Sequence, residues 1–432
     1  MPAQAASNFD LSAGTGSCTA TVPAECTWAA SVLTVLNGAD IEITGTVTNG
    51  TRIEVAANAT ATITLNDVNI SGLAGLQSPL RLNNGADLTL LVEGTNTLTA
   101  GATAAGIRAP AGTSLTIDST VTGTSAGTLT ANSGSPSPSS SGAGIGDGVL
   151  ENAGTITIKG GTITAVSVHT GAGIGGGDSG SGGVITISGG TVIAKSTYRG
   201  AGIGGGVNGA GGTITIIGTA DVTATGGESL LGGSSGSGAG IGSGGTSTGT
   251  PYPAGTITID TSAGAKVNAT GGPSAATGGV GAAIGEGGYG NGGDGAGLAA
   301  MPPAPYGGGS GPTVPPGGNA TLTCPAQGAG YTYQWQQWQA TPAPGSWNNM
   351  AGATAATLTL PAVTAAMSGN QYRCVSTIPI GGGNTFNFPG DPATLTVKNS
   401  TAAAVPTLNE WALMLLALAM LGMAGAGFKR RV

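Results

Sequence analysis

The sequence predicts an all-β protein, because it is rich in glycine, poor in aromatic residues and internally repetitive. Of its 432 residues, 85 are glycine, 7% are charged and 4% are aromatic, so large side chains are too few to fill a conventional core along the whole chain. Ile, Val, Leu and Thr stand between the glycines and favour pleated strands over helices. Repetition must therefore build the core.

The clearest repeat begins with the five residues GAGIG. It occurs at 142–146, 171–175, 200–204 and 238–242, with a variant GAAIG at 281–285 and a degenerate AAGIR at 104–108. The first three starts, at 142, 171 and 200, are 29 residues apart. An apolar run such as TITI at 155–158 follows each motif, and a third run such as TITAV at 162–166 comes next. Each unit thus offers three short strands separated by glycine-rich corners.

Such a unit cannot bury its apolar side alone. Alternation along each strand sends isoleucine to one side and threonine to the other, and stacking successive coils buries the isoleucines. We therefore expect a parallel, right-handed β-helix over residues 30–295, with residues 1–29 as an N-terminal segment or cap.

Threonines between the isoleucines are expected to form an outward ladder along the stack. Some ice-binding β-solenoids carry rows of Thr in this way, but Thr is also favoured on any solvated strand. The predicted ladder consists of Thr64, Thr89, Thr116, Thr157, Thr186, Thr215 and Thr258.

Extra residues accumulate on both sides of the GAGIG motif, at 133–142, 226–237, 243–254 and 286–295. Insertions at one edge of a solenoid usually mark its variable, outward-reaching face. Sugar-binding sites commonly use aromatic and planar polar side chains. Tyr252 and Tyr289 lie in these corners and are therefore candidate ligand-binding residues.

A Pro/Gly-rich linker is predicted at 296–311, and a second domain follows at 312–398. Cys324, Trp335 eleven residues later and the Tyr372–Cys374 triplet resemble the immunoglobulin-like pattern. That resemblance implies a β-sandwich in which Trp335 packs against a disulfide between the two sheets and Tyr372 forms a tyrosine corner. The chain departs from the pattern at Met367, near where many immunoglobulin domains carry Asp.

The tail from 399 to 432 contains an apolar segment, 411–428, followed by the basic end KRR. Eighteen helical residues would be roughly 27 Å long, just enough for a transmembrane helix with its basic end in the cytoplasm. VPTLNEW resembles the start of the IPTL-CTERM sorting signal of Gram-negative bacteria. The resemblance implies an exosortase-type transpeptidase as partner, cleavage near Pro406, Thr407 and Leu408, and transfer to the cell surface or matrix. A plain membrane anchor is the alternative.

The four cysteines form two local pairs, Cys18 with Cys26 and Cys324 with Cys374, and no CxxC spacing occurs. The single histidine, His169, lies far from all of them in sequence, which disfavours a zinc site. We therefore expect disulfides and an oxidising compartment. Ala3-Gln4-Ala5 resembles a signal-peptide cleavage site, so we expect the true start of translation to lie upstream.

The net charge of the chain and the positions of its acidic residues disfavour some classes of function. The net charge of −7, with scattered Lys and Arg, disfavours nucleic acid as a partner. Acids in the repeats are isolated, whereas polysaccharide-cleaving β-helix enzymes need clustered carboxylates, so we expect no catalytic residues. Asp147 comes directly after one GAGIG motif, and Asp178 comes three residues after the next. They are predicted either to approach each other across adjacent coils or merely to solvate turns.

The run from 94 to 206 as a whole resembles the repeats of carbohydrate-binding, adhesin-like bacterial surface proteins. That resemblance implies an extracellular polysaccharide as partner, and it leaves calcium open as a cofactor with no residue assigned to it. The resulting hypothesis is a non-catalytic exported surface protein that binds polysaccharide through Asp147, Asp178, Tyr252 and Tyr289. A purely structural matrix component is the alternative, and a polysaccharide-degrading enzyme is the third hypothesis.

Overall fold

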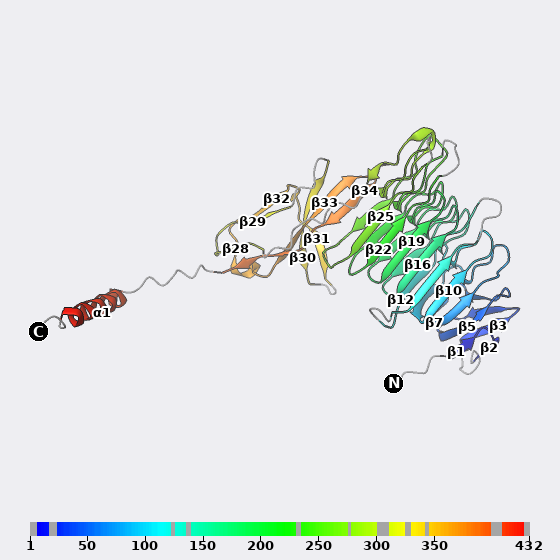
Figure 1. Ribbon diagram of the computed structural model, residues 1–432, viewed down its shortest axis with the longest axis horizontal. Coiled ribbons are helices and arrows are strands. Elements are labelled where there is room, and N and C mark those ends of the chain that lie inside the picture. The colour runs from blue at the N-terminus through cyan, green and yellow to red at the C-terminus, as the bar shows by residue number, and fades with distance from the viewer. Residues whose placement is uncertain are drawn as a thin grey trace, which may run out of the picture.

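The computed structural model is built almost wholly of β-strands, in a long stack of coils followed by a small sandwich and a separate helix (Figure 1). It describes residues 7–16, 24–121, 126–134, 140–229, 235–274, 278–299, 311–324, 330–341, 345–398 and 408–426. The sequence prediction of an all-β chain containing a parallel β-helix and an immunoglobulin-like domain is confirmed.

Each coil of the solenoid contributes one strand to each of three parallel ladders. The first ladder consists of β1 (Ser7–Asp10), β5 (Asp40–Val47), β7 (Thr60–Ile70), β9 (Asp87–Glu93), β12 (Ser114–Asp118), β15 (Thr155–Ile158), β18 (Val184–Ile187), β21 (Thr213–Ile216) and β24 (Thr256–Ile259). The second starts on the ends of β5 and β7 and continues through β10 (Thr95–Thr99), β13 (Thr128–Asn132), β16 (Thr162–Ser167), β19 (Thr191–Ser196), β22 (Asp221–Thr225) and β25 (Lys266–Thr270).

The third ladder contains the GAGIG motifs. Its strands are β4 (Val32–Val35), β6 (Arg52–Val55), β8 (Leu80–Leu82), β11 (Ile107–Arg108), β14 (Ile145–Gly146), β17 (Ile174–Gly175), β20 (Ile203–Gly204), β23 (Ile241–Gly242) and β26 (Ile284–Gly285). Antiparallel strands close its ends, β3 (Cys26–Ala29) against β4 and β27 (Gly297–Leu298) against β26. At the start of the first ladder, β2 (Thr15–Gly16) pairs antiparallel with β1.

Columns of identical aliphatic residues fill the interior. In the first ladder, Ile156 pairs in register with Ile185, and Ile185 with Ile214. These side chains are fully buried and belong to one core cluster that runs through the whole stack. Each coil therefore stabilises the next, and no single coil needs large side chains.

Glycine is required at the end of the third-ladder strands from β14 onward. Gly204 has a φ of +130°, and a Cβ there would overlap the carbonyl oxygen of Gly242 in the next coil. Gly146, Gly175, Gly242 and Gly285 occupy the same position, with φ between +131° and +145°. Only glycine permits both this backbone conformation and this close approach of neighbouring coils.

The outward threonine ladder exists, with one correction. Thr89, Thr116, Thr157, Thr186, Thr215 and Thr258 align in register as predicted. The residue that pairs with Thr89 is Thr62, whereas Thr64 pairs with Leu91. The prediction of Thr64 was therefore wrong by two residues along the strand. β7 is longer than the strands of later coils, and the motif alone does not determine its register.

The second domain is a β-sandwich with its own core. Its strands are β28 (Thr313–Val314), β29 (Ala320–Thr323), β30 (Thr332–Gln339), β31 (Ser346–Asn349), β32 (Thr357–Leu360), β33 (Gln371–Pro379), β34 (Thr385–Pro389), β35 (Ala393–Thr394) and β36 (Thr396–Val397). Among the described residues there are also two short 3-10 helices, η2 (Gly290–Gly292) in the last solenoid loop and η3 (Ala365–Met367) in the sandwich.

The immunoglobulin-like landmarks are in place. Cys324 and Cys374 form a disulfide with Cα atoms 5.7 Å apart. Trp335 pairs in register with Cys374, is 3% exposed and donates its ring N–H to the carbonyl oxygen of Ala355. Tyr372 is buried in the same core, and its hydroxyl lies 3.4 Å from Asn370 Nδ2. Cys26 is also disulfide-bonded, but Cys18, its predicted partner, lies outside the described residues.

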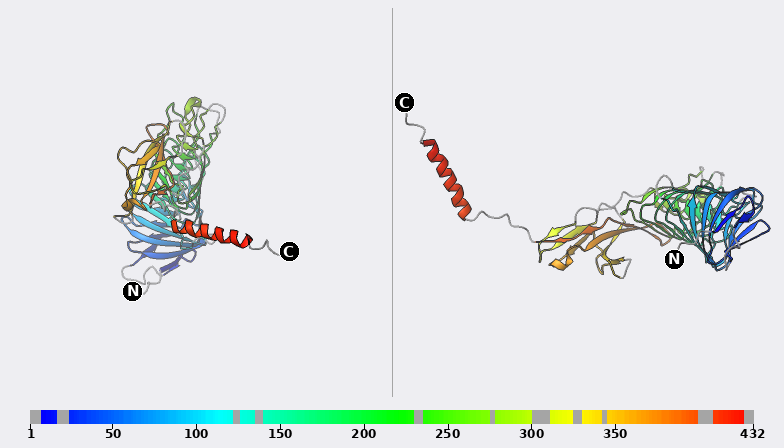
Figure 2. Two further views of the ribbon diagram at one scale, coloured as in Figure 1. Left: turned by 90° about the vertical axis from the view of Figure 1, so that its left-hand side faces the viewer. Right: turned by 90° about the horizontal axis from the view of Figure 1, so that it is seen from below.

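The final helix, α1 (Leu408–Ala426), lies apart from both domains (Figure 2). Its apolar side chains from Leu413 to Leu421 are exposed. Within the described part of the chain, no helix is long and apolar enough to cross a membrane. The transmembrane helix predicted at 411–428 is therefore not confirmed, and its last two residues, together with Pro406, Thr407 and most of the predicted linker, lie outside the described residues.

Candidate binding surfaces of the solenoid

The structure assigns separate partners to Asp147 and Asp178. Gly146 pairs with Gly175, so the residue in register with Asp147 is Gly176, and Asp178 lies further along the turn. There the Asp178 carbonyl accepts the N–H of Leu150, and its carboxylate accepts the hydroxyl of Ser179. Within the described ranges, no three His, Cys, Asp or Glu residues gather closely enough to hold a metal ion.

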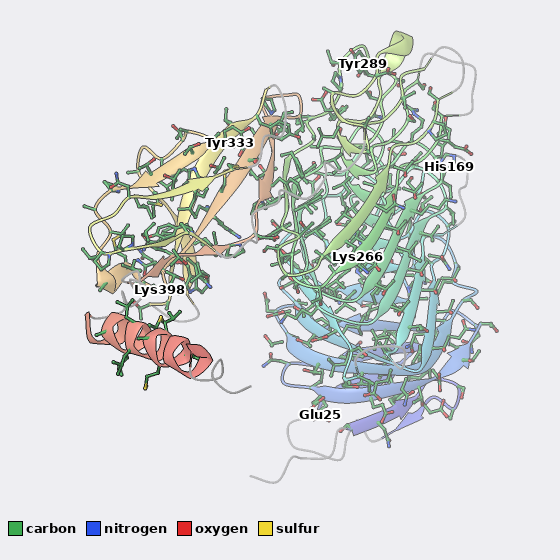
Figure 3. All side chains as sticks on the ribbon, turned by 60° about the vertical axis from the view of Figure 1, so that its left-hand side comes forward. Glu25, His169, Lys266, Tyr289, Tyr333 and Lys398 are labelled. Atoms are coloured by element: carbon green, nitrogen blue, oxygen red, sulfur yellow. A yellow bond between two sulfur atoms is a disulfide. The ribbon has the colours of Figure 1, made fainter. Side chains whose placement is uncertain are left out.

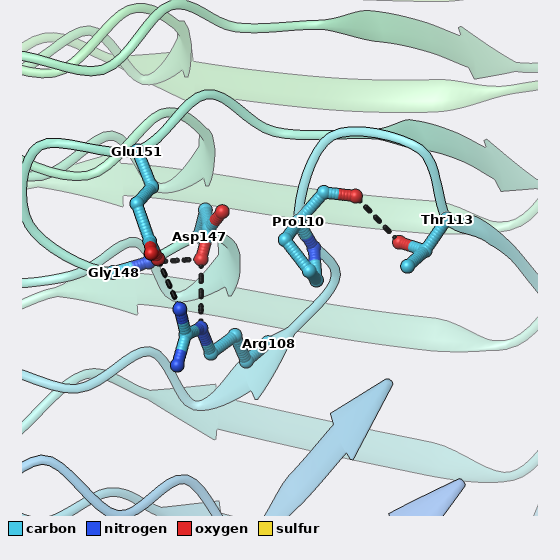
Figure 4. Close-up of polar contacts among 6 residues, drawn as sticks. All are labelled: Arg108, Pro110, Thr113, Asp147, Gly148 and Glu151. Carbon is cyan, nitrogen blue, oxygen red and sulfur yellow. Dashed lines mark hydrogen bonds and ion pairs between the residues drawn. The ribbon is translucent and has the colours of Figure 1, made fainter. Parts of the chain in front are cut away.

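Asp147 instead forms a cluster with Arg108 and Glu151 (Figure 4). Arg108 stands at the position where later coils carry glycine, so its side chain reaches the turn of the next coil. Its Nε lies 2.9 Å from Asp147 Oδ1, and its Nη2 contacts Glu151 Oε2. The N–H of Gly148 also donates to Asp147 Oδ1, at 2.6 Å.

Burial controls the protonation of this cluster. Asp147 is 0% exposed, and its Oδ2 is buried without a hydrogen-bond partner. The pKa of Asp147 is raised to about 7, because burial and a hydrogen bond with Glu151 raise it more than Gly148 and Arg108 lower it. The two acids and the guanidinium therefore form a charge cluster that runs from the exposed Glu151 to the buried Asp147, whose carboxyl is partly protonated near neutral pH.

The sequence analysis did not predict this cluster, because it paired Asp147 only with another acidic residue, Asp178. The degenerate AAGIR motif was the available signal, since aligning it with GAGIG places Arg108 opposite Gly146, next to Asp147. The same alignment shows that the true equivalent of Asp147 in the last coil is Glu286. In both coils the backbone carbonyl at this position accepts the N–H of the motif's first Ala, from Ala143 and Ala282 respectively.

The candidate tyrosines lie in the long C-terminal loops. The carbonyl of Tyr252 accepts the hydroxyl of buried Ser243, which ties that loop to the coil. Tyr289 forms an isolated bridge with Gly293 beside η2, at the tip of the C-terminal loops in Figure 3. Both side chains are partly exposed. Their predicted role in ligand binding stays a prediction.

A third aromatic group lies on the side of the stack. The rings of His169 and Tyr198, from neighbouring coils, stack with centroids 4.6 Å apart. Arg199 lies over the Tyr198 ring at 5.8 Å, donates from Nε to the carbonyl of Gly236 and is only 9% exposed. Arg199 therefore packs inside the long loop of the following coil.

A groove of about 580 Å³ runs over the turns that join the first ladder to the second. We call it the turn groove. It crosses four successive coils, those of β12, β15, β18 and β21. Its lining combines acidic, basic and hydroxyl side chains with a glycine floor: Asp118, Ser119, Val121, Ala126, Lys159, Gly160, Gly161, Thr162, Gly190, Thr191, Thr219 and Asp221.

The floor of the turn groove is open because its turns contain glycine. Gly161 and Gly190 have φ of +86° and +78°, and a Cβ at Gly190 would come within 2.6 Å of the carbonyl oxygen of Gly161. Lys159, Thr191, Thr219 and Asp221 line the groove with exposed side chains. Sequence reasoning assigned the variable face to the insertions around GAGIG and overlooked this more regular corner.

Comparison with known protein families agrees with this architecture. A β-helix repeat model matches residues 156–178 and 185–207, an immunoglobulin domain model matches 310–387, and the IPTL-CTERM motif matches 403–431. A search of curated proteins finds no match. The IPTL-CTERM motif implies processing by an exosortase-type enzyme. With β-helix repeats, an immunoglobulin domain and this sorting motif on one chain, the protein is an exported protein of the bacterial surface.

Proposed function

We propose that the solenoid is a non-catalytic polysaccharide-binding element, and that the turn groove is its binding surface. The observation that carries the proposal is the course of the groove, which follows the stack across four coils and offers polar side chains in each of them. A long polymer can use such a surface, whereas a small ligand would fill only part of it.

Spacing supports a linear glycan as the occupant. Coils paired as parallel strands repeat about every 4.8 Å, a distance comparable with one sugar unit of an extended polysaccharide. A chain lying along the groove would therefore meet a new set of hydroxyl and charged groups at each unit. Lys159 and Asp221 stand at two of these levels, where Lys159 would donate hydrogen bonds to sugar hydroxyls and Asp221 would accept them.

The arrangement of acids supports binding without catalysis. Glycosidic bond cleavage needs two carboxyl groups that both reach the substrate. Asp147 has the strongly raised pKa expected of an acid catalyst, but it is 0% exposed and paired with Arg108. A substrate outside the coil cannot reach it without unfolding the turn.

The test is a glycan array probed with the folded exported chain, with and without calcium. We expect saturable binding that falls at least tenfold in the double variant Lys159→Ala plus Asp221→Ala. Lys195→Ala, which removes an exposed lysine of β19 outside the groove, is the matched control and should bind like the parent. Asp178→Ala and Tyr252→Ala test the loop residues in the same assay.

A blank array in both conditions would reject the binding proposal and favour the purely structural matrix role. Release of new reducing or unsaturated sugar ends from a bound polysaccharide would reject the non-catalytic part. Equal loss of binding in the groove variant and the Lys195→Ala control would show that the groove is not the site.

A further inference from the structure

The hairpin formed by β33 and β34 contributes side chains to two different cores. The sandwich core draws on the first half of β33, including Tyr372 and Cys374. Ile380, Phe386 and Phe388, at the turn and along β34, belong instead to the solenoid core, and they are 1%, 0% and 0% exposed. This hairpin therefore buries its apolar side chains in the core of the other domain. Its strands lie beside the end of the solenoid in Figure 1.

Backbone pairing places β34 where a further coil would lie. β34 pairs in parallel with β24, the last strand of the first ladder, with Ile257 opposite Phe386 and Thr258 opposite Asn387. Phe386 thus ends the inward column of aliphatic residues whose preceding members are Ile185, Ile214 and Ile257. Its ring stacks on Phe388, with centroids 5.8 Å apart.

Polar contacts of Arg373 fix the start of the hairpin. Arg373 of β33 lies 2.6 Å from the carboxylate of Asp260, just beyond β24, and both side chains are largely buried, at 13% and 15% exposure. The same guanidinium donates to Gln336 Oε1 and lies 4.6 Å from the ring centroid of Trp347.

The turn of the hairpin lies against the last third-ladder turn. Gly381 has a φ of +92°, and a Cβ there would come within 2.5 Å of the Glu286 carboxylate, so the turn packs closely against that side chain. Burial raises the pKa of Glu286, in keeping with its enclosed position. The hairpin thus covers the ends of both the first and the third ladders.

An uncovered last coil would make the protein prone to self-association. A terminal repeat without a cap leaves apolar residues in water and unpaired backbone groups that can recruit another strand. In the described structure β27 pairs with β26, β34 pairs with β24, and β25 carries the exposed charge of Lys266. Lysine on an edge strand is a common protection against such pairing.

We propose that the immunoglobulin-like domain is the C-terminal cap of the solenoid, held there by strand addition of its β33–β34 hairpin. The partner of the open solenoid end is thus a segment of the same chain. The last coils and the sandwich form one cooperative unit, and the sorting tail is connected to the solenoid through a rigid junction. This role is independent of any ligand in the turn groove.

Hydrogen exchange on the full chain tests the cap, because it reports on each region separately. In the variant Phe386→Asp we expect amide protection in β24 and β26 to fall at least tenfold, while β15 and β18 in the middle of the stack stay within twofold of the parent. We also expect concentration-dependent self-association by light scattering, because the exposed coil end can pair with a second copy. Thr321→Asp, at an exposed site on β29, which pairs with β32 and not with the hairpin, is the control and should leave both regions unchanged.

The proposal is overturned if β24 and β26 keep their protection in Phe386→Asp, or if the parent unfolds in two separate transitions for solenoid and sandwich. Should Phe386→Asp prevent folding, Phe386→Ala decides by the same criterion, with Phe386→Leu expected to restore most of the protection. Loss of protection in the sandwich strand β30 alone, with β24 unaffected, would also reject the cap.

Discussion

The solenoid and the sandwich reach stability by opposite means. The solenoid has fully buried columns of Ile, Leu, Val and Ala along its length, and glycine turns that let neighbouring backbones approach. The sandwich has a small core centred on Trp335, Tyr372 and a disulfide. A repeated chain can replace large side chains by stacking, whereas a single small domain needs large residues and a covalent link. The following changes test that contrast.

The largest effect is expected in the sandwich. Replacing both Cys324 and Cys374 with Ser opens a loop with a sequence separation of 50 residues. We expect a loss of about 4 kcal/mol, because the unfolded chain regains the freedom that the disulfide removed. Denaturant unfolding followed by Trp fluorescence measures it. A loss below about 1 kcal/mol would show that the core of large side chains suffices without the covalent link.

In the solenoid, we expect the substitution Ile185→Ala to cost about 3 kcal/mol, because it leaves a cavity in a fully buried column. Ile214→Ala, one coil further along the same column, should cost the same within about 0.5 kcal/mol if stacking is the source of stability. Urea midpoints of the two variants test this. Clearly unequal values would mean that individual coils are stabilised by local features.

A pair of glycine substitutions separates two contributions to stability, the close approach of neighbouring coils and the backbone conformation of the glycine. Gly204→Ala should destabilise the solenoid by about 3 kcal/mol, because Ala is strained at φ +130° and its Cβ would overlap the next coil. Gly38→Ala, at φ +82° with nothing within 4 Å of a Cβ, should cost only about 1 kcal/mol. Thermal unfolding of both variants gives the comparison. Equal costs would show that the spacing between coils is not tight at Gly204.

The smallest expected effect concerns pH. The pKa of Asp147 is raised to about 7 in the folded chain, so the folded state binds its proton more tightly than the unfolded state does. Its contribution to stability is therefore full below about pH 4 and is lost as pH rises toward 7. Asp147→Asn, which keeps the shape and cannot ionise, should flatten this part of the stability curve. An unchanged slope in that variant would assign the titration to another group.

Much of the architecture was readable from the sequence because it depends on local patterns. The 29-residue spacing of GAGIG and the alternation in TITI gave the coil, and the register of Ile145, Ile174 and Ile203 follows that spacing. The immunoglobulin-like domain was readable from Cys324, Trp335 and Cys374, since the fold requires those residues at those intervals. The tail could be predicted from its short sequence motif, which matches the IPTL-CTERM model.

Less of the candidate site could be predicted from the sequence. Asp147 was singled out as a ligand-binding candidate by its position after the motif, and that role stays a prediction. Its partners Arg108 and Glu151, which come from another coil and from the same turn, were not predicted. The turn groove arises from side chains of four coils, and no single repeat contains it. Such surfaces depend on which residues the stacking register brings together, and one misjudged strand length, as for Thr64 and Leu91, shifts that register.

The sequence by itself thus determined the repeat, the two kinds of core and the sorting signal, because each is encoded in short-range spacing. Only the tertiary structure decided that the sandwich closes the solenoid. Phe386 and Phe388 have the alternation expected of any half-buried strand, and nothing in that pattern says which core receives them. Their destination depends on the open end of β24, more than a hundred residues earlier in the chain, because burial is settled by what folding brings within reach.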